Sequence, residues 1–243
     1  MKLNCDLGES FGNWQMGQDI QVMPFIDQAN IACGFHAGDP MVMLDTLKLA
    51  KANNVSIGAH PSYPDLVGFG RRSMNCSADE IKAFMLYQIA AIDGMASSLG
   101  LNLEYVKPHG ALYNDMMKDL KVRQAILLAI QQYPKKLKLM MQSTVNFETH
   151  KQQATEFDIE LLAEVFADRC YCDDGSLMPR SELNAVHNQT KILEQVKQLI
   201  ETGTLTTNNN KTLTLQADSL CVHGDNPESI AMIQTIRDLI KRG

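Results

Sequence analysis

Short apolar runs alternate along this chain with segments of helical periodicity, and this alternation restricts the possible folds more than any other feature. The runs are predicted as strands over residues 3–7, 27–33, 55–59, 103–107, 137–141, 160–167 and 219–222. Strands that alternate with helices form parallel sheets in which the helices make the crossovers. The sheet can stay open or can close into a barrel.

The helical segments carry their own start signals. Asp39 followed by Pro40 is a typical N-cap and first turn, and residues 77–80 (SADE) form a capping box that opens a helix ending near Gly100. One amphipathic helix is predicted from the fourth strand to Tyr133, and others over 144–153, over 190–201 and after 227. A surface hairpin is expected over 204–215, with three asparagines at its centre.

Four of the six histidines stand at the ends of predicted strands, each flanked by glycine, alanine or proline. They are His36, His60, His109 and His223. Functional groups of α/β folds gather at the carboxyl ends of strands, and only a barrel brings many strand ends around one opening. The pattern therefore favours an enzyme built as an α/β barrel.

Two acidic residues at the end of the first strand are candidate catalytic groups. Asp6 and Glu9 would stand at the mouth of the barrel, as a general base or as metal ligands. Asp6 with His36 and His60 makes a carboxylate and imidazole set suited to a hydrolytic metal site. The alternative is structural: Asp6 pairs with a buried cation, and Glu9 caps a loop.

The end of the fourth strand carries Lys107 and His109, two residues apart and on one side of the chain. Lys107 could orient an anionic substrate or polarise a carbonyl, and His109 could move protons near neutral pH. The alternative for Lys107 is an ion pair with an aspartate across the barrel interior. Asp225 next to His223 could orient that imidazole or cap the last helix.

Candidate substrate-binding residues lie in the loops that follow the strands. Two neighbouring arginines after flexible glycines suit capture of a carboxylate or phosphate. The predicted substrate-binding residues are Asn4, Arg71, Arg72, Tyr113, Asn114 and Arg180. The chain has neither the GxxxxGK[ST] sequence of a P-loop nor a GxSxG nucleophile elbow.

Size and charge exclude several other classes of protein. A chain of 243 residues fits one barrel domain spanning residues 1–243. A net charge of −6 with no strong basic patch argues against a nucleic-acid partner. No apolar stretch approaches the ~20 residues that cross a bilayer, and the first residues lead straight into a strand. We therefore expect no membrane partner, no signal peptide and a cytoplasmic location.

Seven motifs, in the same order along the whole chain, carry a resemblance to a known family. They are NCDLGE (4–9), NIACGFHAGD (30–39), IGAHPS (57–62), VKPHGALYN (106–114), EVFADR (164–169), DGSL (174–177) and CVHGD (221–225). With these motifs the chain resembles the LamB/YcsF family, the A component of the prokaryotic ATP-dependent 5-oxoprolinase. The sequence departs from the family pattern at residues 142–143 and over 145–157.

The resemblance implies a seven-stranded β/α barrel like that of the glycoside hydrolases and polysaccharide deacetylases. It also implies the reaction, ATP-dependent hydrolysis of 5-oxo-L-proline to L-glutamate, with ATP as cofactor and 5-oxoprolinase subunits B and C as partners. Two alternatives remain open. One is a stand-alone metal-dependent amide hydrolase or deacetylase, and the other is a non-catalytic subunit that binds 5-oxoproline.

Overall fold

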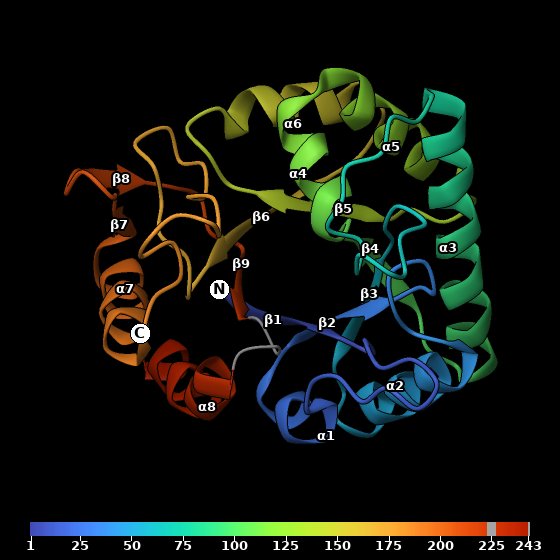
Figure 1. Cartoon of the computed structure of the whole chain (residues 1–243), viewed down its shortest axis with the longest axis horizontal. Helices are drawn as coiled ribbons and strands as arrows, with labels where there is room; N and C mark the ends of the chain where they lie inside the picture. The colour runs from blue at the N-terminus through green and yellow to red at the C-terminus, as the bar shows by residue number, and fades with distance from the viewer. Residues whose placement is uncertain (223–226, 243) are drawn as a thin grey trace.

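A closed parallel barrel forms the centre of the molecule (Figure 1). The computed structural model describes residues 1–222 and 227–242. The barrel strands are β1 (Lys2–Leu7), β2 (Gln28–Ala32), β3 (Ser56–His60), β4 (Leu103–Val106), β5 (Lys138–Gln142), β6 (Leu161–Phe166) and β9 (Ser219–Val222). They pair in chain order, and β9 closes the barrel between β6 and β1. The predicted fold class is confirmed.

Helices surround the barrel and make its crossovers (Figure 1). They are α1 (Asp19–Val22), the 3-10 turn η1 (Met23–Phe25), α2 (Pro40–Ala52), α3 (Ala78–Ser98), α4 (Gly110–Lys118), α5 (Leu120–Gln132), α6 (Phe147–Thr155), α7 (Gln189–Thr202) and α8 (Pro227–Arg242). Outside the barrel, β7 (Thr204–Thr206) and β8 (Thr212–Thr214) form the expected hairpin. Across the described residues, no helix combines the length and the apolar character needed to span a membrane.

Local start signals placed several helices correctly. The Asp39 side chain accepts hydrogen bonds from the backbone of the first turn of α2, and Ser77 and Glu80 form the capping box of α3. The single helix predicted before Tyr133 is wrong, because the structure has α4 and α5 there. Asp119 takes an extended conformation between them, and its side chain caps α5. The chain turns there because a capping aspartate offers the backbone a partner outside the helix.

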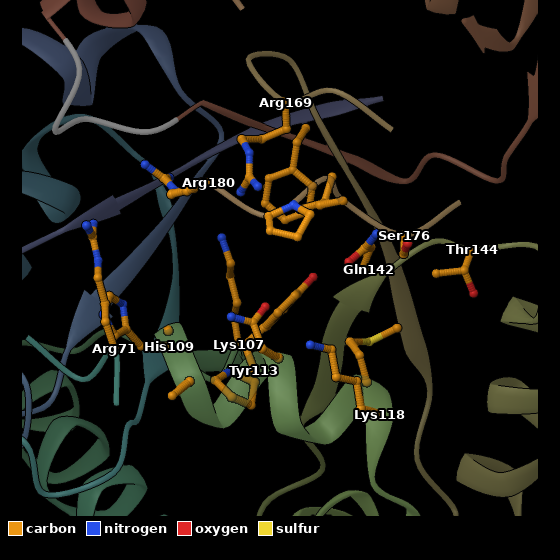
Figure 2. A pocket seen from close by; sticks show the side chains of 18 of the residues that line it. Arg71, Lys107, His109, Tyr113, Lys118, Gln142, Thr144, Arg169, Ser176 and Arg180 are labelled. Atoms are coloured by element: carbon orange, nitrogen blue, oxygen red, sulfur yellow. The ribbon is translucent and has the colours of Figure 1, made fainter. Parts of the chain in front are cut away.

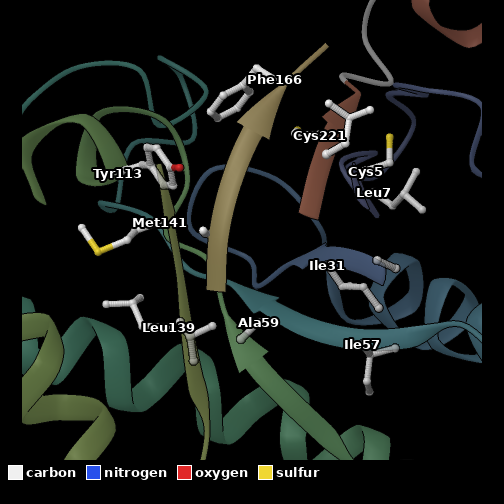
Figure 3. Close-up of a cluster of buried hydrophobic side chains, with 14 of the residues drawn as sticks. Cys5, Leu7, Ile31, Ile57, Ala59, Tyr113, Leu139, Met141, Phe166 and Cys221 are labelled. Carbon is white, nitrogen blue, oxygen red and sulfur yellow. The ribbon is translucent and has the colours of Figure 1, made fainter. Parts of the chain in front are cut away.

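Side chains alternate along the strands between the helices outside and the barrel interior. Apolar residues face outward and pack under the helices, as Leu7, Ile31, Ile57 and Leu139 do in Figure 3. Residues paired across parallel strands share a face of the sheet. The register therefore points the polar residues of neighbouring strands into the barrel interior. The barrel therefore has its main hydrophobic core outside the strands and a polar layer within.

Hydrogen bonds between uncharged side chains hold the polar layer together. Asn4 Nδ2 donates to Ser219 Oγ at 2.7 Å, and Ser219 in turn donates to Gln28. Asn30 Nδ2 donates to Asn4 Oδ1 at 2.8 Å, and the Tyr105 hydroxyl donates to Asn30 Oδ1 at 2.6 Å. Buried polar groups are stable when they are paired in this way. This layer forms a rigid floor under the carboxyl ends of the strands.

Candidate active site

A cavity of about 660 Å³ opens above the polar floor, where the strands end (Figure 2). The loops that follow β1, β3, β4, β5 and β6 line it, so residues far apart in sequence face one space. Of the residues predicted for the site, those lining the cavity are Asp6, Glu9, His60, Arg71, Lys107, His109, Tyr113, Asn114 and Arg180. The carboxyl ends of the strands thus form a single site, as expected for a barrel.

A buried network of charges lies at the base of the cavity. The Lys107 ammonium lies 2.9 Å from Asp6 Oδ1 and 2.7 Å from Glu164 Oε1, and the Tyr113 hydroxyl donates to Glu164 Oε2 at 2.6 Å. Burial alone would lower the pKa of Lys107, but Asp6, the Cys221 thiol and Glu164 outweigh it and hold this pKa well above its usual value. The lysine is therefore a fixed cation. The structural alternative considered for Asp6 and Lys107, an ion pair across the barrel, is present.

Three imidazoles and one carboxylate form a second cluster beside this network. His36, His60, His109 and Glu9 each offer one ligand atom, and these four atoms lie within 4.8 Å of one another. His36 Nε2 lies 3.1 Å from Glu9 Oε1, and the His36 and His109 rings stack with their centroids 3.7 Å apart. Burial, reinforced by the neighbouring imidazoles, holds the pKa values of His36 and His109 well below the ordinary value. The cluster is one to which a metal ion could bind.

A glycine in the loop after β3 lets the chain pass close to these imidazoles. Gly70 has φ +64°, and a Cβ there would lie 2.8 Å from His109 Cδ2 and 2.8 Å from His36 Cβ. The preceding carbonyl, that of Phe69, accepts a hydrogen bond from His109 Nε2 at 2.9 Å. Glycine is needed because this backbone conformation is strained for other residues and because there is no room for a side chain. The loop therefore holds the His109 ring in place.

Cationic side chains gather around the cavity, with Arg71 beside His109 and with Arg169 and Arg180 on another side (Figure 2). Figure 2 shows Arg71, Lys107, Arg169 and Arg180 around one space. Burial lowers the pKa of Arg169, and the charge of nearby Arg180 lowers it further. Two arginines this close together create a positive potential that favours an anion. Arg72, by contrast, does not line the cavity and pairs with Asp65 within its own loop.

A comparison with known proteins shows which family the chain belongs to. The family model described as "LamB/YcsF family" matches residues 1–243. The chain belongs to the LamB/YcsF family. A 5-oxoprolinase A subunit from Vibrio campbellii is 50% identical, with 100% of this chain and 96% of that protein covered. Another 5-oxoprolinase A subunit, from Pseudomonas aeruginosa, is 51% identical, with 97% and 94% covered.

A solved structure shows the same fold for another protein related to this LamB/YcsF chain. The crystal structure of a lactam utilization protein from Thermus thermophilus superposes with a TM-score of 0.91 and 34% sequence identity. The match covers 100% of this chain and 96% of that one. The resemblance inferred from seven sequence motifs is thus confirmed over the full length.

Within this LamB/YcsF barrel, some predicted site residues lie elsewhere than expected. Asn4 is buried in the polar floor, out of the cavity. The carboxylate grouped with the imidazoles is Glu9, whereas Asp6 lies beside them, 3.4 Å from His60 Nε2, and pairs with Lys107. His223 and Asp225 lie outside the described residues.

Sequence reasoning assigned no role to Glu164 or Arg169, both of which the structure places at the site. Glu164 pairs with Lys107, and Arg169 lines the cavity. A signal was available in the sequence, because Glu164 interrupts an otherwise apolar strand and a carboxylate is buried only with a partner. Both residues also stand in the EVFADR motif.

Proposed function

We propose that this chain is the A subunit of an ATP-dependent 5-oxoprolinase, which hydrolyses 5-oxo-L-proline to L-glutamate together with subunits B and C. The names of the relatives support this role. The observation that carries it is the Lys107 ammonium, fixed between two carboxylates at the base of a cavity whose wall bears imidazoles. This arrangement combines a charge stabiliser with proton-transfer groups in one site.

The electrostatics of the cavity suit a small anionic substrate. The chain carries a net charge of −6, yet among the residues that the structure describes five cations and three acids line the cavity. The cations are Arg71, Lys107, Lys118, Arg169 and Arg180, and the acids are Asp6, Glu9 and Asp174. We assign Arg169 and Arg180 to the substrate carboxylate or to a phosphoryl group. Tyr113 and Asn114 also line the space that the substrate would occupy. A planar guanidinium binds either anion through two hydrogen bonds.

A lactam is a stable amide, so its carbonyl carbon must be activated before water can attack. ATP would supply the activation by phosphorylating the amide oxygen. Water then adds to the carbon, and the ring C–N bond breaks as the nitrogen takes a proton, which leaves an acyl phosphate. A second water hydrolyses the acyl phosphate to the carboxylate of glutamate and free phosphate. In this scheme Asp6 accepts the proton of the attacking water, or His109 does through Nδ1 when no cation is bound to that nitrogen, and Lys107 stabilises negative charge on the oxygen. ATP reaches the site in the assembly with subunits B and C.

The test is glutamate release from 5-oxoproline by the purified chain, with and without ATP and with and without the two partner subunits. We expect release only when ATP and both partners are present. Asp6→Asn and His109→Ala should each lower the rate by about 100-fold or more if they transfer protons. His187→Ala is the matched control, because His187 does not line the cavity, and it should retain activity.

Two other outcomes would replace this proposal. Amide hydrolysis by the chain alone, without ATP and dependent on bound metal, would identify a stand-alone amide hydrolase. Binding of 5-oxoproline that survives both substitutions, with no effect on the rate of the assembly, would identify a non-catalytic binding subunit. Each outcome is read from the same set of purified proteins.

A further inference from the structure

Backbone carbonyls fix which nitrogen carries the proton in two of the clustered imidazoles. His60 Nδ1 lies 2.7 Å from the Lys107 carbonyl oxygen, and His109 Nε2 lies 2.9 Å from the Phe69 carbonyl oxygen. A carbonyl only accepts hydrogen bonds, so each of these nitrogens must be the N–H donor. In the neutral rings, His60 Nε2 and His109 Nδ1 are therefore left with lone pairs.

These two lone pairs face each other. His60 Nε2 and His109 Nδ1 lie 2.9 Å apart, and neither has a proton to offer the other. The other neighbours of these two nitrogens are carboxylate oxygens, which also only accept. Asp6 Oδ2 lies 3.4 Å from His60 Nε2, and Glu9 Oε1 lies 3.5 Å from His109 Nδ1. Acceptors held this closely repel one another unless a cation lies between them.

We propose that Glu9 Oε1, His60 Nε2 and His109 Nδ1 bind a divalent cation of the zinc type at the mouth of the barrel. Two imidazoles and a carboxylate are a donor set that suits zinc and its neighbours in the first transition row. Ligands bound tetrahedrally at about 2.0–2.1 Å stand about 3.3 Å from one another. The separations of 2.9 Å and 3.5 Å lie on either side of that value.

The surroundings of the cluster match those of a metal site with an open position. The two carbonyl acceptors play the part that outer hydrogen-bond partners of metal-bound histidines play, which is to fix the tautomer and the ring orientation. His36 is buried, and its Nε2 lies 3.1 Å from Glu9 Oε1, where it orients that carboxylate. Glu9, His60 and His109 all line the cavity, so the remaining coordination position faces the space for a ligand.

A cation at this position goes beyond the proposed 5-oxoprolinase role and does not depend on it. Bound there, a zinc-type ion would polarise a carbonyl oxygen or activate a water at the edge of the cavity. Metal binding can be measured on the chain alone, without partner subunits, ATP or substrate. A failure of the metal site would therefore leave the proposed 5-oxoprolinase role untouched, and the reverse also holds.

The experiment uses the untagged full-length chain, stripped with a chelator and titrated with Zn²⁺ by calorimetry and with Co²⁺ by visible absorption. We expect one equivalent of Zn²⁺ and the d–d bands of a four-coordinate cobalt ion. His60→Ala and His109→Ala should each weaken Zn²⁺ binding by at least about 100-fold, and His36→Gln by about 10–100-fold. His187→Ala removes a histidine away from the cluster and should bind as the wild type does.

Folding is monitored separately, by circular dichroism and by the melting temperature in chelator. The melting temperature of wild type should rise when Zn²⁺ is added, and those of the His60 and His109 variants should not. The proposal is overturned if the folded wild type binds no Zn²⁺, which would mean that the two imidazoles share a proton. It is also overturned if the His60, His109 and His187 variants bind Zn²⁺ equally well.

Discussion

Replacing Lys107 by methionine tests whether one buried ammonium holds the base of the site together. The Lys107 Nζ atom contacts Asp6 Oδ1 at 2.9 Å and Glu164 Oε1 at 2.7 Å. With an effective dielectric of about 20, each contact is worth about 6 kcal/mol of attraction, and the removal of the charges from water cancels most of that. Removing one partner of a buried ion pair costs about 3–5 kcal/mol, because the other charge is left buried. We expect a loss of that size here.

The loss should depend on pH, and its sign follows from the charges that remain. In wild type the pKa of Lys107 is raised well above 10.5, so its stabilising charge is present below 10.5 and lost only as the pH rises through the folded-state value. In Lys107→Met, Asp6 and Glu164 lose the ammonium that both contact, and their side chains are only 13% and 0% exposed. Protonation of either one relieves the repulsion between them, so the deficit should shrink as the pH is lowered.

Urea unfolding followed by circular dichroism measures the free energy of unfolding at each pH. Lys118→Met is the matched control, since Lys118 is an exposed lysine at the same cavity, and its effect should stay within about 0.5 kcal/mol. Adding Glu164→Gln to Lys107→Met should recover part of the loss, because contacting residues are not additive. A deficit below about 1 kcal/mol, or one that does not change with pH, would contradict a stabilising role for the buried Lys107 ammonium.

Three further changes probe the barrel and its helices. Gly58→Ala should cost about 1–3 kcal/mol, because a Cβ there would overlap Cε2 of Tyr105; an unchanged urea midpoint would contradict this packing. Ser77→Ala should lower the melting temperature through a loss of about 1 kcal/mol, since Ser77 Oγ caps the backbone N–H of Glu80; equal melting curves would show that the cap contributes nothing. Burial lowers the pKa of His150 from 6.5 to about 4, so stability should fall as the pH drops from 6.5 toward about 4. In His150→Gln, the free energy of unfolding should change less between pH 6.5 and about pH 4. Parallel pH curves for the variant and wild type would contradict this role of His150.

The sequence was sufficient for the fold because its signals were local and repeated. Each barrel strand is a short apolar run, and caps such as Asp39 and Ser77 show where helices begin. Closure of the barrel followed from one non-local argument, that functional residues spread over many strand ends need a common opening. The break at Asp119 escaped prediction because the apolar periodicity continues across it and only the backbone shows the turn.

Residue types at strand ends indicated the site, but their pairing could not be read from the sequence. Lys107 and Glu164 are 57 positions apart, and only the register of the closed barrel brings them to 2.7 Å. The choice between Glu9 and Asp6 as neighbour of the imidazoles likewise depends on how the loop after β1 turns. Arg72 looked equivalent to Arg71 in sequence, yet Asp65 holds it in its own loop. Such distances between loops are set by packing that no local pattern encodes.

The charges of the site fall into two halves, and this division constrains what can occupy the cavity. Among the described residues, the half around Lys107 and the imidazoles holds the carboxylates of Asp6, Glu9 and Glu164, with Lys107 and Arg71 as its cations. The opposite half carries Arg169 and Arg180. The uncharged floor beneath adds no compensating charge, so each half favours a partner of opposite sign. An occupant that is cationic toward the imidazoles and anionic toward the arginines, such as a metal-bound carboxylate or phosphate ester, satisfies both halves at once.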